Sequence, residues 1–226
     1  MARNQDGDFG GDVFGAVEAL AVVPVVEIDD ATSAVPLART LAEAGLPVVE
    51  VTFRTPAARD AVAAIAAELP DFLLGAGTLV TADMVAAAVD AGARFGVSPG
   101  LSSACVAAAA EHGLPFVPGA VTPSEVGGCL EVGAKYVKFF PAGAYGGMAT
   151  LKALDGPFGW TGIRFMPTGG VRPDNAAEFL ALPNVFAVGG TWIAPRGDIA
   201  AGRWEDIAER ARAAVKLRPH RQGAVA

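Results

Sequence analysis

Two ionisable residues of the chain lie inside apolar segments, where an uncompensated charge is costly. Lys138 stands between a valine and a phenylalanine in the run KYVKFFP (135–141), and Glu50 stands between two valines in the run PVVEVTF (47–53). A buried ion pair is often less stabilising than well-packed apolar residues, so its retention usually has another reason. These two positions are therefore the first candidates for chemistry.

A desolvated lysine together with a carboxylic acid is the minimum apparatus for Schiff-base chemistry. Burial favours the neutral form of an amine, which is the form that attacks a carbonyl carbon. A carboxyl group in an apolar pocket can move protons in the same reaction. Of the lysines, only Lys138 is expected in a dry interior, whereas Lys135 begins the same run and is expected to be solvated. The alternative is that Lys138 and Glu50 form a purely structural ion pair.

Two glycine pairs next to threonines indicate a site for an anion. Pro167–Gly170 ends one apolar run, and Gly189–Thr191 ends the next run along the chain. Glycine lets a ligand approach the backbone N–H groups closely, and threonine hydroxyls add donors. Parallel barrels often bind phosphate at the loops after their last two strands. Either glycine pair alone could be a tight turn, but two at matching places favour phosphate.

Further polar residues are expected at the same ends of the strands. Alternation along a strand puts Glu50, Thr52 and Arg54 on one face, with Arg54 at the carboxyl end. Thr78 follows a glycine-rich turn and places a hydroxyl there, although it could equally be a helix N-cap. Pro99 could simply end its strand.

The elements that must position these residues alternate regularly along the chain. Short runs that are apolar at both odd and even positions are typical of buried parallel strands. We expect strands at 22–28, 47–53, 72–78, 94–99, 115–120, 135–141, 163–170 and 185–190. Alanine-rich amphipathic segments between and after them predict helices at 31–44, 56–68, 81–91, 102–112, 122–132, 147–154, 173–180 and 205–216.

Eight strand–helix units predict an α/β fold, a closed (β/α)8 TIM barrel, more naturally than an open doubly wound sheet. No GxGxxG sequence follows the first strand, which also disfavours a dinucleotide-binding fold. A short helix at 11–20 is expected to precede the first strand and to close the barrel floor. We expect residues 1–226 to form a single domain, with mobile ends at about 1–10 and 218–226.

Composition excludes several classes of protein. Hydrophobic residues make up 52% of the chain, which provides a large core, and the net charge of −7 disfavours nucleic acid as a partner. No uninterrupted apolar window of about 18 residues predicts a membrane span. The two cysteines form no close-spaced motif, so a reduced, cytoplasmic setting is the simpler expectation. Without an HxxxH or CxxC pair we expect no metal site, and nothing calls for a cofactor.

At these residues the sequence resembles the 2-keto-3-deoxy-6-phosphogluconate (KDPG) / 4-hydroxy-2-oxoglutarate (KHG) aldolase family. The resemblance runs in order, without large gaps, from about Val22 to Leu217. Its markers are 22–25 (VVPV), 49–55 (VEVTFRT), 75–78 (GAGT), 98–100 (SPG), 138–141 (KFFP), 167–170 (PTGG) and 189–192 (GGTW).

The resemblance implies a class I aldolase that releases pyruvate and D-glyceraldehyde 3-phosphate, and that could also cleave 4-hydroxy-2-oxoglutarate to pyruvate and glyoxylate. It implies that Lys138 forms the Schiff base and that Glu50 shuttles protons. It further implies that the pyruvoyl half is held by Arg54, Thr78 and Thr168, that Pro99 and Phe140 line the pocket, and that phosphate is received by Gly169, Gly170, Gly189, Gly190 and Thr191. Members are typically homotrimers.

Some positions depart from the family pattern. Glu27 stands at the end of the first strand, where some members have arginine, so Arg54 must be the carboxylate clamp and Glu27 becomes its candidate partner. Thr191 replaces a common serine, and Gly143 stands where relatives often have glutamate.

Three other functions remain open on the sequence. The nearest is an aldolase for the epimeric 2-dehydro-3-deoxy-6-phosphogalactonate. The others are a phosphate-binding barrel isomerase or decarboxylase without a covalent step, and a non-catalytic sugar-phosphate binder. The last two would not need Lys138 and Glu50 in a dry interior.

Overall fold

The computed structural model describes residues 11–218. All paired strands are parallel, and they form one six-stranded sheet and one two-stranded sheet. The larger sheet has the order β5-β4-β3-β2-β1-β8, and the smaller pairs β6 with β7. The strands are β1 (Val22–Val26), β2 (Val48–Thr52), β3 (Leu73–Gly77), β4 (Phe95–Val97), β5 (Phe116–Val117), β6 (Tyr136–Phe139), β7 (Arg164–Pro167) and β8 (Val188–Gly190).

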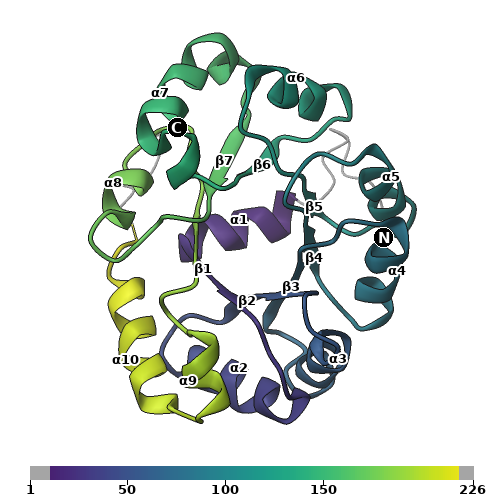
Figure 1. The fold of residues 1–226 in the computed structure, drawn as a ribbon, viewed down its shortest axis with the longest axis vertical. Helices are drawn as coiled ribbons and strands as arrows, with labels where there is room; N and C mark the ends of the chain where they lie inside the picture. The colour runs from purple at the N-terminus through teal and green to yellow at the C-terminus, as the bar shows by residue number, and fades with distance from the viewer. Residues whose placement is uncertain (1–10, 219–226) are drawn as a thin grey trace.

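The six-stranded sheet curls, and the β6-β7 pair lies in the gap between its two edges (Figure 1). Isolated parallel bridges join the pair to the sheet on both sides, one between Gly119 and Lys138 and one between Thr168 and Gly189. A further bridge joins Phe165 to Val185. The predicted α/β architecture with parallel strands is therefore confirmed.

The strands are shorter than the apolar runs predicted. The run 115–120, for example, contains a strand only at Phe116–Val117. Burial continues beyond the hydrogen-bonded ladder, because Ala120 and Val121 are buried although they lie outside a strand. An apolar run indicates which residues are buried, whereas the bounds of a strand depend on backbone hydrogen bonds. The end of the run therefore need not be the end of the strand.

Helices surround the strands (Figure 1). Three predicted helix starts are N-caps, since the side chains of Thr81, Ser102 and Thr122 accept hydrogen bonds from backbone N–H groups of the first turn. The helices are α1 (Gly11–Leu20), η1 (Ala31–Ser33), α2 (Ala34–Glu43), α3 (Ala58–Glu68), α4 (Ala82–Asp90), α5 (Ser103–Glu111), α6 (Pro123–Glu131), η2 (Gly143–Tyr145), α7 (Gly147–Phe158), η3 (Gly159–Thr161), α8 (Ala176–Leu180), α9 (Arg196–Ala200) and α10 (Trp204–Val215).

Several helix bounds differ from the prediction. Helix α7 continues to Phe158, four residues past its predicted end, and α8 begins at Ala176, three residues after its predicted start. Helix α9 was not predicted, because its five residues are too few to show a helical repeat.

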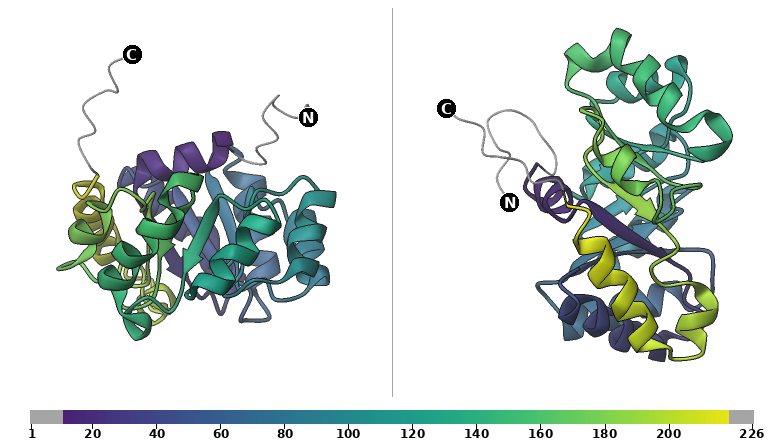
Figure 2. Two further views of the ribbon diagram at one scale, coloured as in Figure 1. Left: turned by 90° about the horizontal axis from the view of Figure 1, so that it is seen from above. Right: turned by 90° about the vertical axis from the view of Figure 1, so that its left-hand side faces the viewer.

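The predicted helix before the first strand is α1, with the bounds expected. It lies across one end of the ring of strands in Figures 1 and 2. Its Phe14 packs on Tyr136, at the start of β6, and on Phe186, just before β8, with ring centroids 4.6 and 6.3 Å away. Helix α1 therefore covers the amino ends of the strands, which leaves their carboxyl ends available for a site.

The predicted mobile ends lie outside the described residues, except for Arg218. Its Nη2 donates to the carbonyl oxygen of Gly45 at 2.7 Å. Along residues 11–218, no helix is long and apolar enough to cross a membrane.

Candidate active site

Lys138 of β6 and Glu50 of β2 meet on the inner side of the strands. Lys138 Nζ donates to Glu50 Oε1 at 3.0 Å, and the two side chains are 4% and 0% exposed. Strands β2 and β6 are not neighbours, so the two side chains approach one another across the interior rather than along a shared ladder. Nζ also lies 5.3 Å from the centre of the Phe140 ring. The expected burial of both groups and the solvent exposure of Lys135 are confirmed.

The second oxygen of the Glu50 carboxylate differs from the first in its contacts. Within residues 11–218, Oε2 is buried and has no hydrogen-bond partner. A buried carboxylate oxygen without a partner costs free energy, which a purely structural ion pair would normally avoid. This oxygen is therefore the part of Glu50 that a substrate could use.

Gly77 makes room for this carboxylate, a role that the sequence analysis missed. It lies on β3, next to β2, where Thr52 pairs with Gly77 in register. A Cβ atom at Gly77 would lie 2.1 Å from Glu50 Oε1, far inside van der Waals contact. The signal in the sequence was the glycine pair Gly75 and Gly77 at strand spacing, since glycine in a strand marks close approach by another group.

Arg54 follows the carboxyl end of β2, as expected, and two residues hold its guanidinium. Nη1 donates to Glu27 Oε1 at 2.7 Å, and Nε donates to Thr78 Oγ1 at 3.2 Å. The expected pairing of Glu27 with Arg54 is confirmed. Thr78 has a φ of 60°, in the left-handed region that residues other than glycine rarely adopt, and such strain often marks a functional site.

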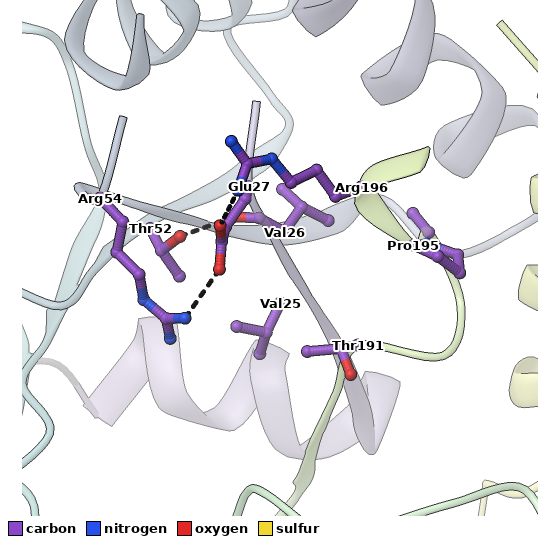
Figure 3. Close-up of a pocket in the computed structure, with 9 residues that line it drawn as sticks. Val25, Val26, Glu27, Thr52, Arg54, Thr191, Pro195 and Arg196 are labelled. Carbon is purple, nitrogen blue, oxygen red and sulfur yellow. Dashed lines mark hydrogen bonds and ion pairs between the residues drawn. The ribbon is translucent and has the colours of Figure 1, made fainter. Parts of the chain in front are cut away.

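A second arginine reaches the same carboxylate, and the sequence analysis did not foresee it. Arg196 begins α9, and its Nη1 donates to Glu27 Oε2 at 3.1 Å (Figure 3). The same guanidinium binds Asp29 through Nε at 2.7 Å and Nη2 at 2.6 Å. These hydrogen bonds lower the pKa of Asp29, because they stabilise its ionised form. No motif in the sequence joins residues 27, 29 and 196.

A cavity of about 330 Å³ opens beside these charges. It is lined by the end of β1, by Thr52 and Arg54, and by the segment 191–196 (Figure 3). The structure thus brings together Arg54 and Thr191, two of the predicted binding residues. Lys138 and Glu50 do not line this cavity.

The carboxyl ends of β7 and β8 lie side by side. Thr168 and Gly189 form a bridge, and a Cβ at Gly189 would lie 2.3 Å from Thr168 Oγ1. Gly169 and Gly170 have φ of 81° and 89°, which fits a turn that only glycine adopts easily.

The loop after β6 is tied to the turn after β7. Gly143 N–H donates to the Gly169 carbonyl at 2.8 Å, and a Cβ at Gly143 would lie 3.3 Å from Gly170 Cα. Glycine at position 143 therefore lets the two backbones approach closely.

The remaining predicted residues lie near this region. Phe140 lies beside Lys138, as described above, and Pro99 is half-buried, with its carbonyl oxygen 2.3 Å from the place of a Cβ at Gly119. In the part of the chain described, no group of three or more histidine, cysteine, aspartate and glutamate residues could hold a metal ion.

A parallel α/β fold that places a desolvated lysine against a carboxylate, with an arginine at the carboxyl ends of the strands, defines an enzyme of the lysine-nucleophile class. Comparison with known proteins specifies it further. The profile of the KDPG and KHG aldolase family matches residues 14–210. The chain belongs to this family.

Individual relatives agree with this assignment. The chain is 46% identical to a 2-dehydro-3-deoxy-phosphogluconate aldolase of Treponema pallidum over 195 residues, which are 86% of this chain and 92% of that protein. It is 43% identical to the KHG/KDPG aldolase of Escherichia coli K12, over 86% and 91% of the two chains. Its fold matches the KDPG aldolase of Legionella pneumophila, captured with pyruvate as a covalent carbinolamine, with a TM-score of 0.85 and 42% identity over 89% and 97% of the chains.

Proposed function

We propose that the chain cleaves 2-dehydro-3-deoxy-6-phosphogluconate to pyruvate and D-glyceraldehyde 3-phosphate through a Schiff base on Lys138. A second reaction at the same site cleaves 4-hydroxy-2-oxoglutarate to pyruvate and glyoxylate. The observation that carries the proposal is the 3.0 Å contact between the buried Lys138 Nζ and Glu50 Oε1. Membership of the family supports the choice of substrates.

In this mechanism Lys138 is the nucleophile, and the imine that it forms accepts the electron pair of the bond that breaks. Glu50 accepts one proton from the lysine, and the neutral amine attacks the C2 carbonyl of the substrate to form a carbinolamine. Glu50 gives its proton to the departing hydroxyl group, so loss of water leaves a protonated imine and restores the Glu50 carboxylate. The C3–C4 bond then breaks, and its electron pair moves towards the imine nitrogen, leaving an enamine.

Glu50 carries the protons of the later steps. It takes the proton of the C4 hydroxyl as that carbon becomes the aldehyde, and it returns a proton to C3 of the enamine to form the methyl group. Water then hydrolyses the imine, so the water lost earlier is replaced, and pyruvate leaves Lys138 free. The contact distance and the unpaired Oε2 support this double role.

The remaining residues bind the substrate in this proposal. Arg54 pairs with the carboxylate, while Thr78 and Thr168 contact the oxygens of the pyruvoyl half. Pro99 and Phe140 form apolar walls. Phosphate is received at the turns after β7 and β8, by the backbone of Gly169, Gly170, Gly189 and Gly190 and by the Thr191 hydroxyl.

We also propose that the eight strands form one closed barrel and that residues 1–226 form one domain. The bridges at both edges of the β6-β7 pair support closure, since a closed barrel leaves no free sheet edge. The homotrimeric state and the cytoplasmic location that we propose rest on the family resemblance and on cysteine usage, respectively.

Reductive trapping tests the covalent step. Incubation with pyruvate and sodium borohydride should add the mass of a reduced pyruvate adduct to the wild type, at Lys138. Lys138→Ala should abolish both trapping and cleavage, because the other lysines of residues 11–218 are exposed and lie outside the interior. Lys135→Ala is the matched control from the same strand region, and it should retain both.

Intact mass and peptide mapping provide the measurement, with circular dichroism to check the fold. Trapping that persists in Lys138→Ala would contradict the assignment of the nucleophile. Cleavage by a wild type that is never trapped would favour a non-covalent barrel enzyme instead.

A further inference from the structure

Four charged groups form a continuous chain, of which Arg54, Glu27 and Arg196 line the cavity. Arg54 contacts Glu27, Glu27 contacts Arg196, and Arg196 contacts Asp29, at distances of 2.7, 3.1 and 2.6 Å. Figure 3 shows the Glu27 carboxylate lying between the two arginines, which come from opposite sides of it. Each Glu27 oxygen therefore accepts a hydrogen bond from one arginine.

This arrangement fixes Arg54 while leaving part of it free. Arginine has five N–H donors, of which Nε carries one and each terminal nitrogen carries two. Nε is bound to Thr78 and one N–H of Nη1 is bound to Glu27. Within residues 11–218 the other donors have no protein partner, so the outer edge of the guanidinium can receive a planar carboxylate.

The second arginine also changes the charge that Arg54 presents. A carboxylate paired with Arg54 alone would offset much of its positive charge and would compete with an anionic ligand. Arg196 shares Glu27 through the other oxygen, so the negative charge of Glu27 is divided between two cations. Asp29 in turn holds the Arg196 guanidinium with two hydrogen bonds, which fixes its orientation. The two arginines and two carboxylates together carry no net charge, whereas without Arg196 the group would carry a net negative charge beside the anion site.

The position of Arg196 supports a role beyond helix formation. It is the first residue of α9, where a cation gains nothing from the helix dipole. It is 56% exposed, and it lines the same cavity as Arg54 and Thr191. Its side chain is nevertheless held by Glu27 and Asp29, which follow the end of β1.

We propose that Glu27 and Arg196 are positioning residues that hold Arg54 and preserve its charge for the carboxylate of the pyruvoyl group. The inference rests on the proposed function, because it assigns the carboxylate to Arg54. It adds that α9, which lies outside the repeating strand–helix pattern, adjusts affinity for the pyruvoyl half and has no direct contact with the substrate.

The test uses pyruvate alone, which has no phosphate. The pyruvate concentration that half-saturates borohydride trapping is measured for the full-length wild type and its variants. Arg196→Ala should raise this concentration roughly threefold to tenfold, a usual size for coupling between contacting charges. Arg196→Lys should restore part of the loss, because lysine keeps the charge but cannot make the forked contact.

A double-mutant cycle separates positioning from direct contact. Glu27→Ala removes the carboxylate that joins Arg196 to Arg54, so Arg196 should have no effect in its absence. Adding Arg196→Ala to Glu27→Ala should cause no increase in the half-saturating concentration. Arg39→Ala is the matched control, since it removes an arginine from an exposed 3.0 Å ion pair with Glu68 on α2 and α3.

Several results would overturn the inference. One is an unchanged response to pyruvate in Arg196→Ala. Another is a loss that persists in full without Glu27, which would show that Arg196 acts on the ligand directly. A loss confined to the phosphorylated substrate would assign Arg196 to phosphate. Absence of trapping in the wild type would instead overturn the proposed function itself.

Discussion

At the scale of single residues, the two oxygens of the Glu50 carboxylate have different surroundings. Oε1 accepts the hydrogen bond from Lys138, while Oε2 has no partner within the described part of the chain. Gly77 leaves the space that this carboxylate occupies, since a side chain there would collide with Oε1. A group that only balanced the charge of Lys138 would need neither the free oxygen nor the glycine.

Glu50→Gln tests the transfer of protons. Glutamine keeps the size of the side chain and an oxygen that can accept from Lys138, so pyruvate should still be trapped by borohydride, but more slowly because glutamine cannot accept the lysine proton. Exchange of the methyl protons of pyruvate in deuterated water should slow by roughly 10²–10⁴, the usual contribution of a positioned acid or base. Nuclear magnetic resonance measures the exchange, with the exposed Glu68→Gln as control. Exchange at the wild-type rate would leave Glu50 with a structural role only.

At the scale of elements, the packing of the loops after the strands limits which substitutions can test the proposed phosphate site. The glycines of the proposed phosphate turns cannot be enlarged without wider damage. A Cβ at Gly190 would lie 1.8 Å from the Trp192 ring, and one at Gly170 would lie 2.9 Å from Gly143 Cα. Substitution of these glycines would therefore disturb packing as well as any bound anion. Thr191 is exposed and lines the cavity, so its hydroxyl can be removed alone.

Thr191→Val should affect the phosphorylated substrate selectively. A hydrogen bond to a charged group contributes about 1.5–3 kcal/mol, so kcat/KM for the phosphorylated sugar acid should fall about tenfold to a hundredfold. The value for 4-hydroxy-2-oxoglutarate should change little, because that molecule has no phosphate. The measurement is the ratio of the two kcat/KM values in wild type and variant. Equal losses for both substrates would remove Thr191 from the phosphate site.

At the scale of the whole molecule, close packing changes the chemistry of groups far from the site. Cys129 lies on the buried face of α6. Burial, together with the nearby Glu125 carboxylate, raises the pKa of its thiol to about 12. Both effects disfavour the thiolate in the folded protein. The thiolate is the reactive form, so the folded chain protects this cysteine.

Cys129 should therefore make stability depend on pH in the alkaline range. Above pH 9 the unfolded thiol ionises whereas the folded one does not, until about pH 12. In this window the free energy of unfolding should fall by up to about 1.4 kcal/mol per pH unit because of this group. Urea denaturation of the wild type and Cys129→Ala between pH 8 and 11 measures the difference. Parallel pH profiles for the two proteins would contradict the prediction.

The sequence determined much of this protein by itself. Buried strands must be apolar on both faces, so the eight runs were recognisable from composition. The amphipathic segments between them marked helices such as 122–132, whose predicted first residue is an N-cap. The isolated charges Lys138 and Glu50 were recognisable for the same reason, because burial of an ionised group among apolar side chains costs free energy. The pairing of Glu27 with Arg54 followed from their places at the ends of two adjacent strands.

Only the tertiary structure decided which distant residues meet. Arg196 reaches Glu27 across 169 positions of sequence, and Lys138 reaches Glu50 across 88. The local sequence around these residues does not predict either contact, because both contacts depend on how the strands are arranged around the interior. The space that Gly77 leaves for Glu50 likewise depends on strand register. Sequence patterns report whether a residue is buried, whereas packing in three dimensions selects the atoms that it contacts.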